Sequence, residues 1–208
     1  MSTLQNQSGY IEDANPLSVK TTETALPTGA ASSAKQDTQI TAEQAIQTAV
    51  EGVLSVKSID DVYEATLSLD TNAYADGDVL ADTQSLEANA FPANGGKLLV
   101  QSIQVIDLDD QKGALDIVLL RSNTSLGTEN SAPNIVDGNA DEILCVKRIY
   151  STDYKDIGGV SWASIDVSEV IKAASDATAL FVAAISRDTK TYTASGLIVR
   201  VGVLGRSA

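Results

Sequence analysis

Histidine is absent from this sequence of 208 residues, and cysteine occurs once, at Cys145. The absence of histidine removes the usual general base near neutral pH, the commonest metal ligand and the Ser-His and Cys-His catalytic pairs. A single cysteine excludes an intrachain disulfide and a thiolate zinc cluster. These absences argue against most classes of enzyme, so we expect a protein without catalysis, cofactor or bound metal.

Basic side chains are also few: 14 Lys and Arg stand against 28 Asp and Glu, which gives a formal charge of −14 at pH 7. Affinity for nucleic acid depends mainly on neutralising phosphates with basic groups. Anionic lipid surfaces attract clusters of basic residues in the same way. We therefore expect neither nucleic acid nor a membrane as a partner.

Long hydrophobic runs are missing as well. No stretch of about 18 apolar residues could form a membrane-spanning helix. The opening residues 1–20 lack the basic region and the apolar region of a secretory signal. We expect a soluble protein that is made in a cytoplasm.

Residues 1–33 are rich in Ser, Thr, Gln, Asn and Ala, contain Pro16 and Pro27, and have Tyr10 as their one aromatic residue. Such a segment cannot bury enough apolar surface to offset the entropy lost on ordering. The sequence therefore predicts an extended arm that becomes ordered against a partner.

Residues 34–55 change to good helix formers without proline, and Ser32 or Ser33 is placed as an N-cap. Apolar residues recur at spacings of three and four and form a stripe opposite Gln, Glu and Thr. The sequence predicts an amphipathic helix that packs either on its own domain or in a short parallel bundle of copies. The residues expected at an oligomer contact are Ala42, Ile46, Ala49, Val50 and Val53.

Residues 56–208 carry the signals of β structure. Tyr63, Ala65, Leu67 and Leu69 alternate with polar or exposed-type neighbours, which is typical of a half-buried strand. Further strands are expected at 98–108, 114–121, 142–149, 179–186 and 196–204, with a short one at 78–80. One or two helical turns are expected in 166–176, where Val167, Val170, Ile171 and Ala174 would share a face and Ser168 would cap them.

Turn-forming sequences, including Asp76-Gly77-Asp78 and residues 109–113, separate these strands. The strand at 114–121 is expected to form a hairpin with the one before it. About seven strands with so little helix predict a mainly β fold, an antiparallel β-sandwich of the jelly-roll kind. The whole chain is then an extended N-terminal arm, one α-helix and a β-sandwich domain.

Few residues suggest chemistry. Asp107, Asp109 and Asp110 resemble a calcium loop, but Lys112 occupies the position that requires glycine, so a turn is the better interpretation. Trp162 could stack on a sugar, although a lone tryptophan in a sandwich more often fills the core or its rim. Cys145 is expected to be a small buried hydrophobic residue.

A resemblance to a known family rests on two stretches. Residues 15–39 closely resemble a segment near the N-termini of tailed-bacteriophage virion proteins, in which LPTGAA and a small linker precede AKQDT at the start of a helix. Residues 71–82 and 91–120 look like the C-terminal domain of such proteins. The residues that match the first segment are Leu26, Pro27, Thr28, Gly29, Ala30, Ala31, Ala34, Lys35, Gln36, Asp37 and Thr38.

The resemblance implies a structural virion component without enzymatic activity, often trimeric, that is made in the host cytoplasm. The leading hypothesis is a capsid decoration or head-fibre protein whose arm binds the major capsid protein or another virion protein. A receptor- or glycan-binding module of the tail is the alternative, and a glycan-cleaving enzyme is a third. The expected anchoring residues are Leu17, Val19, Leu26, Pro27, Thr28, Gly29, Ala30 and Ala31.

Overall fold

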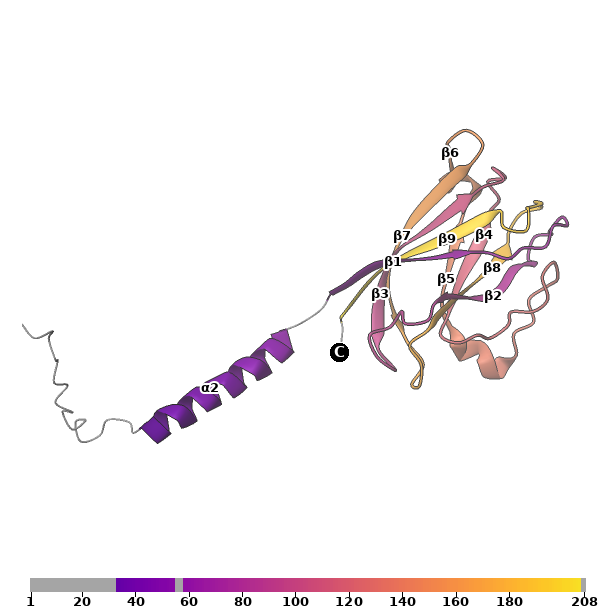
Figure 1. Ribbon diagram of the computed structural model, residues 1–208. Coiled ribbons are helices and arrows are strands. Elements are labelled where there is room, and N and C mark those ends of the chain that lie inside the picture. Colours follow the sequence, from indigo (N-terminus) through magenta and orange to yellow (C-terminus); the bar gives the residue numbers. More distant parts are fainter. Residues whose placement is uncertain (1–32, 55–57, 207–208) are drawn as a thin grey trace, which may run out of the picture. The chain divides into compact units, whose positions relative to one another are not determined.

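The computed structural model describes residues 33–54 and 58–206. The arm expected at residues 1–33 therefore lies almost wholly outside the described residues. The chain divides into two compact units, Met1–Ser55 and Val56–Ala208. The described part of the first unit is one helix, and the described part of the second unit contains nine strands (Figure 1).

Helix α2 spans Ser33–Leu54, which is the region where the sequence predicts a helix. The run has no proline and no glycine before Gly52, so nothing interrupts the helical hydrogen bonds over most of its length. The described side chains from Lys35 to Ala49 are all exposed. They include the large apolar side chains of Ile40 and Ile46, which are 51% and 63% exposed.

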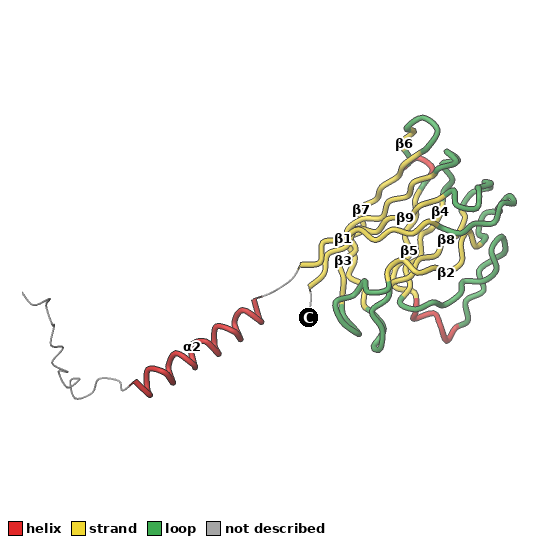
Figure 2. Tube along the Cα trace, viewed as in Figure 1, coloured by secondary structure: helices red, strands yellow, loops and turns green. Residues whose placement is uncertain are grey.

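The second unit consists of two antiparallel sheets (Figure 2). The five-stranded sheet has, in spatial order, β1 (Ser58–Thr66), β9 (Leu197–Arg206), β3 (Lys97–Asp107), β7 (Ser161–Lys172) and the short β6 (Lys155–Asp156). The four-stranded sheet has β2 (Val79–Glu87), β8 (Leu180–Ser186), β4 (Leu115–Leu120) and β5 (Ile143–Ile149). Two 3-10 helices, η1 (Asp137–Glu142) and η2 (Ser151–Asp153), lie in the loops on either side of β5.

The strand order is that of a jelly roll. Without the two-residue β6, one sheet has the order β1-β9-β3-β7 and the other has β2-β8-β4-β5, so the chain crosses repeatedly between the sheets. Two four-stranded antiparallel layers connected in this way form the double-sheet jelly roll. The prediction of a mainly β, jelly-roll-like sandwich with one helix is confirmed.

The main hydrophobic core lies between the two sheets. Along and beyond β1, Tyr63, Leu67 and Leu69 are buried while Glu64 and Ser68 are exposed, as the predicted alternation requires. The Tyr63 hydroxyl donates a hydrogen bond to the Ala90 carbonyl at 3.0 Å, so its one polar group is satisfied inside the core. The core is thus complete within the second unit.

A second, smaller core covers the outer face of the four-stranded sheet. β4 is buried on both faces: Leu119 belongs to the main core, whereas Val118 and Leu120 pack outward against Leu126. Segment 121–142 is held in this position partly by the Leu126 N–H, which donates to the Asp82 carboxylate at 2.7 Å. This covering loop explains why β4 is uniformly apolar except at Asp116.

Two predictions about local structure are wrong. The strand at 114–121 forms no hairpin with its predecessor, because β3 pairs with β7 and β9 while β4 pairs with β5 and β8 of the other sheet. The turn between them, residues 108–114, carries the chain from one sheet to the other. Turn residues show where the chain reverses, but they do not specify which strand becomes the hydrogen-bonding partner.

The helical turns expected in 166–176 are absent, because this segment belongs to the long strand β7 and its following turn. The pairing of β7 with β3 is irregular between Val100 and Ser102, and Ser168 has a positive φ of 52°. Burial along β7 still alternates from residue to residue, so Val167 and Ile171 face the core while Val170 is exposed. A spacing of four is twice the period of a strand and about one turn of a helix, so Val167 and Ile171 share a face in either structure.

Candidate functional site

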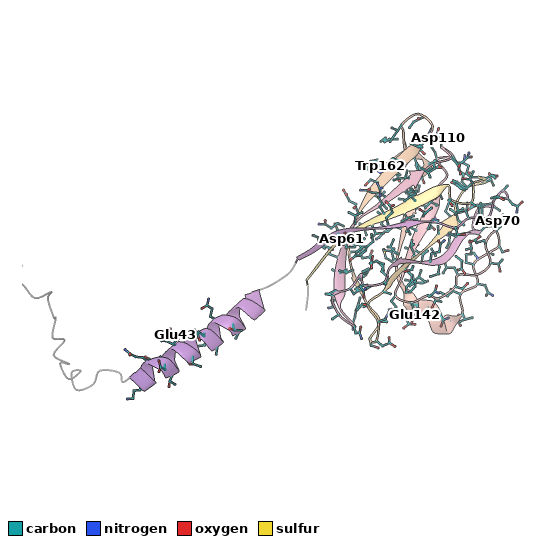
Figure 3. The ribbon with its side chains drawn as sticks, viewed as in Figure 1. Glu43, Asp61, Asp70, Asp110, Glu142 and Trp162 are labelled. Carbon is teal, nitrogen blue, oxygen red and sulfur yellow. The ribbon has the colours of Figure 1, made fainter. Side chains whose placement is uncertain are left out.

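Four loops gather at one end of the sandwich. β1 runs from Ser58 to Thr66, and β9 returns antiparallel to it with Arg206 opposite Ser58. The loops β1–β2, β3–β4, β5–β7 and β8–β9 therefore lie at the end opposite the one where the chain enters at Ser58. Figure 3 shows this separation: Asp61, in β1, lies toward the end where the chain enters, and Asp70, in the β1–β2 loop, lies toward the other end.

Three of these loops line a pocket of about 450 Å³. Thr71 comes from the β1–β2 loop, Asp109 and Gln111 come from the β3–β4 loop, and residues 191–194 come from the β8–β9 loop. The lining carries three threonine hydroxyls, one carboxylate, one carboxamide and one phenol. The pocket therefore combines several hydrogen-bonding groups with a lining surface that is more apolar than polar.

Asp109 joins two walls of this pocket. The Thr193 N–H donates to Asp109 Oδ2 at 2.6 Å, and the Thr193 hydroxyl lies 3.0 and 3.1 Å from the two carboxylate oxygens. The Leu108 N–H donates to the Gly196 carbonyl at 2.8 Å. A Cβ added at Gly196 would contact the Asp109 carboxylate at 2.0 Å, so the absence of a side chain there permits this close approach.

Tyr192 forms the buried side of the pocket. The residue is 4% exposed, and the centroid of its ring lies 6.4 Å from that of Tyr74, at an interplanar angle of 55°. A Cβ at Gly113 would lie 2.4 Å from the Tyr192 hydroxyl, so this glycine makes room for the phenol. Burial raises the pKa of Tyr192, with nearby carboxylates adding to the effect, and the phenol stays protonated.

The β3–β4 loop is held by Asp107, which is fully buried beneath it. The Asp107 carboxylate accepts hydrogen bonds from the backbone N–H groups of Asp109 at 3.0 Å and Lys112 at 2.7 Å. Burial raises the pKa of Asp107 despite these hydrogen bonds. The Lys112 ammonium group pairs with Asp110 at 3.1 Å and Asp156 at 2.8 Å. Residues 109–113, where the sequence predicts a turn, therefore form a turn held by hydrogen bonds and ion pairs.

No group of three or more His, Cys, Asp or Glu residues within 33–54 and 58–206 is placed to hold a metal ion. Nor does any helix in these ranges combine the length and apolar character that crossing a bilayer requires.

An ion-pair network anchors the same end of the sandwich. Asp116 of β4, 4% exposed, accepts two hydrogen bonds from Arg148 at 2.7 and 3.0 Å and one from Arg187 at 2.7 Å. Burial acts to raise the pKa of Asp116, but the two guanidinium groups outweigh it and lower that pKa. Because Arg187 follows β8 directly, the network fixes the start of the β8–β9 loop.

Cys145 is buried, as the sequence predicts, and its thiol lies 3.4 Å from a Glu169 carboxylate oxygen. Burial raises the pKa of the Cys145 thiol to about 12, with the Glu169 charge adding to the effect. A thiol held protonated in this way is a poor nucleophile. Its position indicates a packing role.

Trp162 is half-buried on β7, opposite Ile106 of β3 and Lys155 of β6 (Figure 3). Its neighbour Ala163 is fully buried in the core, so alternation places Trp162 on the other face of the five-stranded sheet. This position agrees with the interpretation of a rim residue. Trp162 does not line the pocket.

The anchoring residues expected in the arm lie outside the described residues. Of the residues expected at the oligomer contact, Ala42, Ile46 and Ala49 are exposed on α2. Val50 and Val53 belong to the same helix. The pocket itself has no counterpart in the sequence predictions, because its walls come from three loops that only the jelly-roll connectivity brings together.

Comparison with models of protein families gives no match, and comparison with curated proteins gives none either. Among solved structures, the chain is similar to a carbohydrate-binding module, CBM27-1 of Caldicellulosiruptor saccharolyticus, in complex with mannohexaose. The identity is 13% and the TM-score 0.32, over 74% of this chain and 99% of that one. A chain of the full particle of Israeli acute paralysis virus heated to 63 degrees is also similar, at 12% identity and a TM-score of 0.25, over 73% of this chain and 72% of that one. Since both TM-scores are low, the fold assignment stands on this chain's own strand order.

Proposed function

We propose that this chain is a non-enzymatic structural protein of a tailed-phage virion. Residues 1–33 bind the particle, through the major capsid protein or another virion protein, and the sandwich is displayed outside as a capsid decoration or head fibre. The resemblance of residues 26–31 and 34–38 to a segment of tailed-phage virion proteins supports this role. The protein is made in the host cytoplasm and ends in the virion.

The observation that carries the proposal is the difference between the two units. The sandwich satisfies its own core, in which Leu119, Val105 and Val199 are completely buried. The helix instead presents Ile40 and Ile46 largely exposed. Ile46 lies on the predicted apolar stripe with Ala42 and Ala49, and an exposed apolar stripe is typical of a helix surface that binds another chain. The first unit is therefore suited to binding other chains, and the second is suited to exposure on the outside of the particle as a folded domain.

The occupant of the exposed helical stripe, in this proposal, is the same stripe on two further copies of the chain. Ala42, Ile46 and Ala49 recur at spacings of four and three, the pattern of a coiled-coil seam, and Val53 continues it. The helix of 22 residues provides about three heptads for this contact. A homotrimer would bind one particle through three arms at once, and this avidity would strengthen its attachment.

The charge of the sandwich supports a displayed, non-adhesive surface. Several basic side chains are already paired with carboxylates: Lys112, Lys147, Arg148, Arg187, Lys190 and Arg200. With 28 acidic against 14 basic residues in the chain, this pairing leaves an acidic excess on the surface. Such a surface favours solubility and keeps neighbouring particles apart.

The test is co-sedimentation with tailed-phage particles that lack the protein. We expect the full chain to pellet with the particles and a variant without residues 1–33 to remain in the supernatant while keeping its β-rich circular dichroism spectrum. Gln101→Ala, an exposed position on β3, is the control and should bind normally. Binding that survives the deletion contradicts the anchoring role.

The pocket favours a second candidate, a receptor- or glycan-binding module at the tail. A protein that only covers the capsid does not need a concave site with several hydrogen-bonding groups at one end of its sandwich. Immunogold labelling of virions distinguishes the two locations, because a decoration or head fibre labels the head and a receptor-binding module labels the tail.

A further inference from the structure

The pocket faces away from the end at which the chain enters the sandwich. β1 has nine residues, so at about 3.3 Å per residue it separates the two ends by about 30 Å. Thr71 follows β1, whereas Ser58 begins it. If the protein is held through its N-terminal unit, as proposed above, the chain joins the sandwich at the end opposite the pocket.

The lining selects a class of ligand. Asp109 and the threonine hydroxyls offer acceptors, while the Gln111 carboxamide and the hydroxyls of Thr71 and Thr191 offer donors. No basic side chain is among the described lining residues, so nothing in the pocket would compensate an anionic group. A set of donors and acceptors with one carboxylate suits the vicinal hydroxyls of a neutral sugar, each of which can both donate and accept. A charge-assisted hydrogen bond from such a hydroxyl to Asp109 is stronger than a neutral one.

The pocket is also built in advance of a ligand. Three hydrogen-bond contacts from Thr193 hold Asp109, and the Gln111 carboxamide donates to the Asp109 carbonyl at 3.2 Å. The Leu69 N–H donates to the Ala194 carbonyl at 3.1 Å and ties the third loop to the other two. A site whose walls are already fixed loses little conformational entropy when a ligand binds.

From this geometry we infer that the loop pocket formed by Thr71, Asp109, Gln111 and residues 191–194 is a binding site for a neutral saccharide. Its volume of about 450 Å³ lies in the range usual for small-molecule sites. The biological role of the site, contact with sugars on a surface that the particle meets, rests on the proposed function. Binding itself does not depend on that proposal.

The experiment applies the full chain to an array of neutral oligosaccharides that contain glucose, galactose, mannose, rhamnose or N-acetylhexosamines, printed beside sialylated counterparts. Positive glycans are then titrated by calorimetry. The test variants are Asp109→Asn and Thr191→Val. Asp166→Asn and Thr66→Val make the same chemical changes at exposed positions on β7 and β1, outside the pocket.

We expect at least one neutral glycan to bind, the two pocket variants to bind about tenfold more weakly, and the two controls to bind as the parent does. If Asp109→Asn lowers the melting temperature, Gln111→Ala replaces it, since that side chain makes only one described hydrogen bond. Absence of binding to every glycan, stronger binding to the sialylated forms, or binding unaffected by the pocket variants overturns the inference. The particle co-sedimentation result is independent of all three outcomes, so the two proposals can fail separately.

Discussion

The helix and the sandwich differ in how far their apolar side chains are buried. In the sandwich, alternating side chains from both sheets enclose one another, and many, such as Leu67 and Ile103, have no exposed surface. In α2 the described side chains are all exposed, Ile46 by 63%. The contrast shows that the described apolar burial is concentrated in the second unit. Under the proposed function, stability and attachment then belong to different parts of the chain, so substitutions in the two units should have separable effects.

The largest expected effect is in the main core. Leu119→Ala removes a completely buried side chain from β4 and should lower the free energy of unfolding by about 3 kcal/mol, through lost burial and the cavity left behind. Chemical denaturation followed by circular dichroism measures it. Ile46→Ala is the matched control in the helix, and an equal loss from that variant would contradict the separation of the two units.

The next effect is in the ion-pair network. Asp116→Asn weakens the bonds from Arg148 and Arg187 and should lower the free energy of unfolding by about 2 kcal/mol at pH 7. Because folding lowers the pKa of Asp116, its contribution is complete above the unfolded value of 3.8 and is lost as the pH falls through the lower folded value.

The difference in stability between the parent and Asp116→Asn should therefore shrink below about pH 4. Thermal melts of both proteins from pH 7 to pH 2.5 measure this difference. A difference that stays constant over the range would show that the carboxylate charge is not what stabilises the network. Asp166→Asn, at an exposed position, is the control and should match the parent throughout.

The jelly roll was predictable from the sequence because its strands carry strong local signals. The alternation after Val62 and the turn at Asp76-Gly77-Asp78 both reappear in the structure, where Gly77 has a positive φ of 94°. Partner choice was not predictable, since a turn between β3 and β4 looks the same whether the strands pair or cross between sheets. The spacing of four between Val167 and Ile171 fits a strand as well as a helix, so the apolar pattern alone did not distinguish the two.

The pocket lay beyond sequence reasoning for the same physical reason. Asp109 and Thr193 are 84 residues apart, and only the antiparallel neighbours β3 and β9 bring their loops together. Gly196 is the one local signal, since a glycine directly before a buried strand indicates a close approach of other atoms. Without the fold, however, it does not reveal that the approaching group is Asp109.

A smaller effect is expected at this glycine. Gly196→Ala places a methyl group against the Asp109 carboxylate and should displace it from Thr193, at a cost of about 1 kcal/mol of stability. Saccharide binding should fall with it. Gly138→Ala is the control, because a Cβ there meets no atom within 4 Å. Unchanged saccharide binding in Gly196→Ala would show that the ligand site does not depend on the hydrogen bonds between Asp109 and Thr193.

The smallest effect on the sandwich is expected from the helix. Ile46→Asp puts a charge into the apolar stripe of α2 and should abolish self-association while changing the unfolding of the sandwich by no more than about 0.5 kcal/mol. Sedimentation velocity and thermal melts measure the two quantities on the same sample. Gln44→Asp introduces the same charge outside the predicted contact and should leave association intact. Association that persists in Ile46→Asp would assign the contact to another surface.

The division of roles is tested most directly by the masses in solution of the full chain and of residues 56–208, measured by light scattering after size exclusion. The account predicts three times the chain mass of 21.7 kDa for the full protein and a folded monomer for the fragment. A monomeric full chain, or a fragment that remains trimeric, would contradict it.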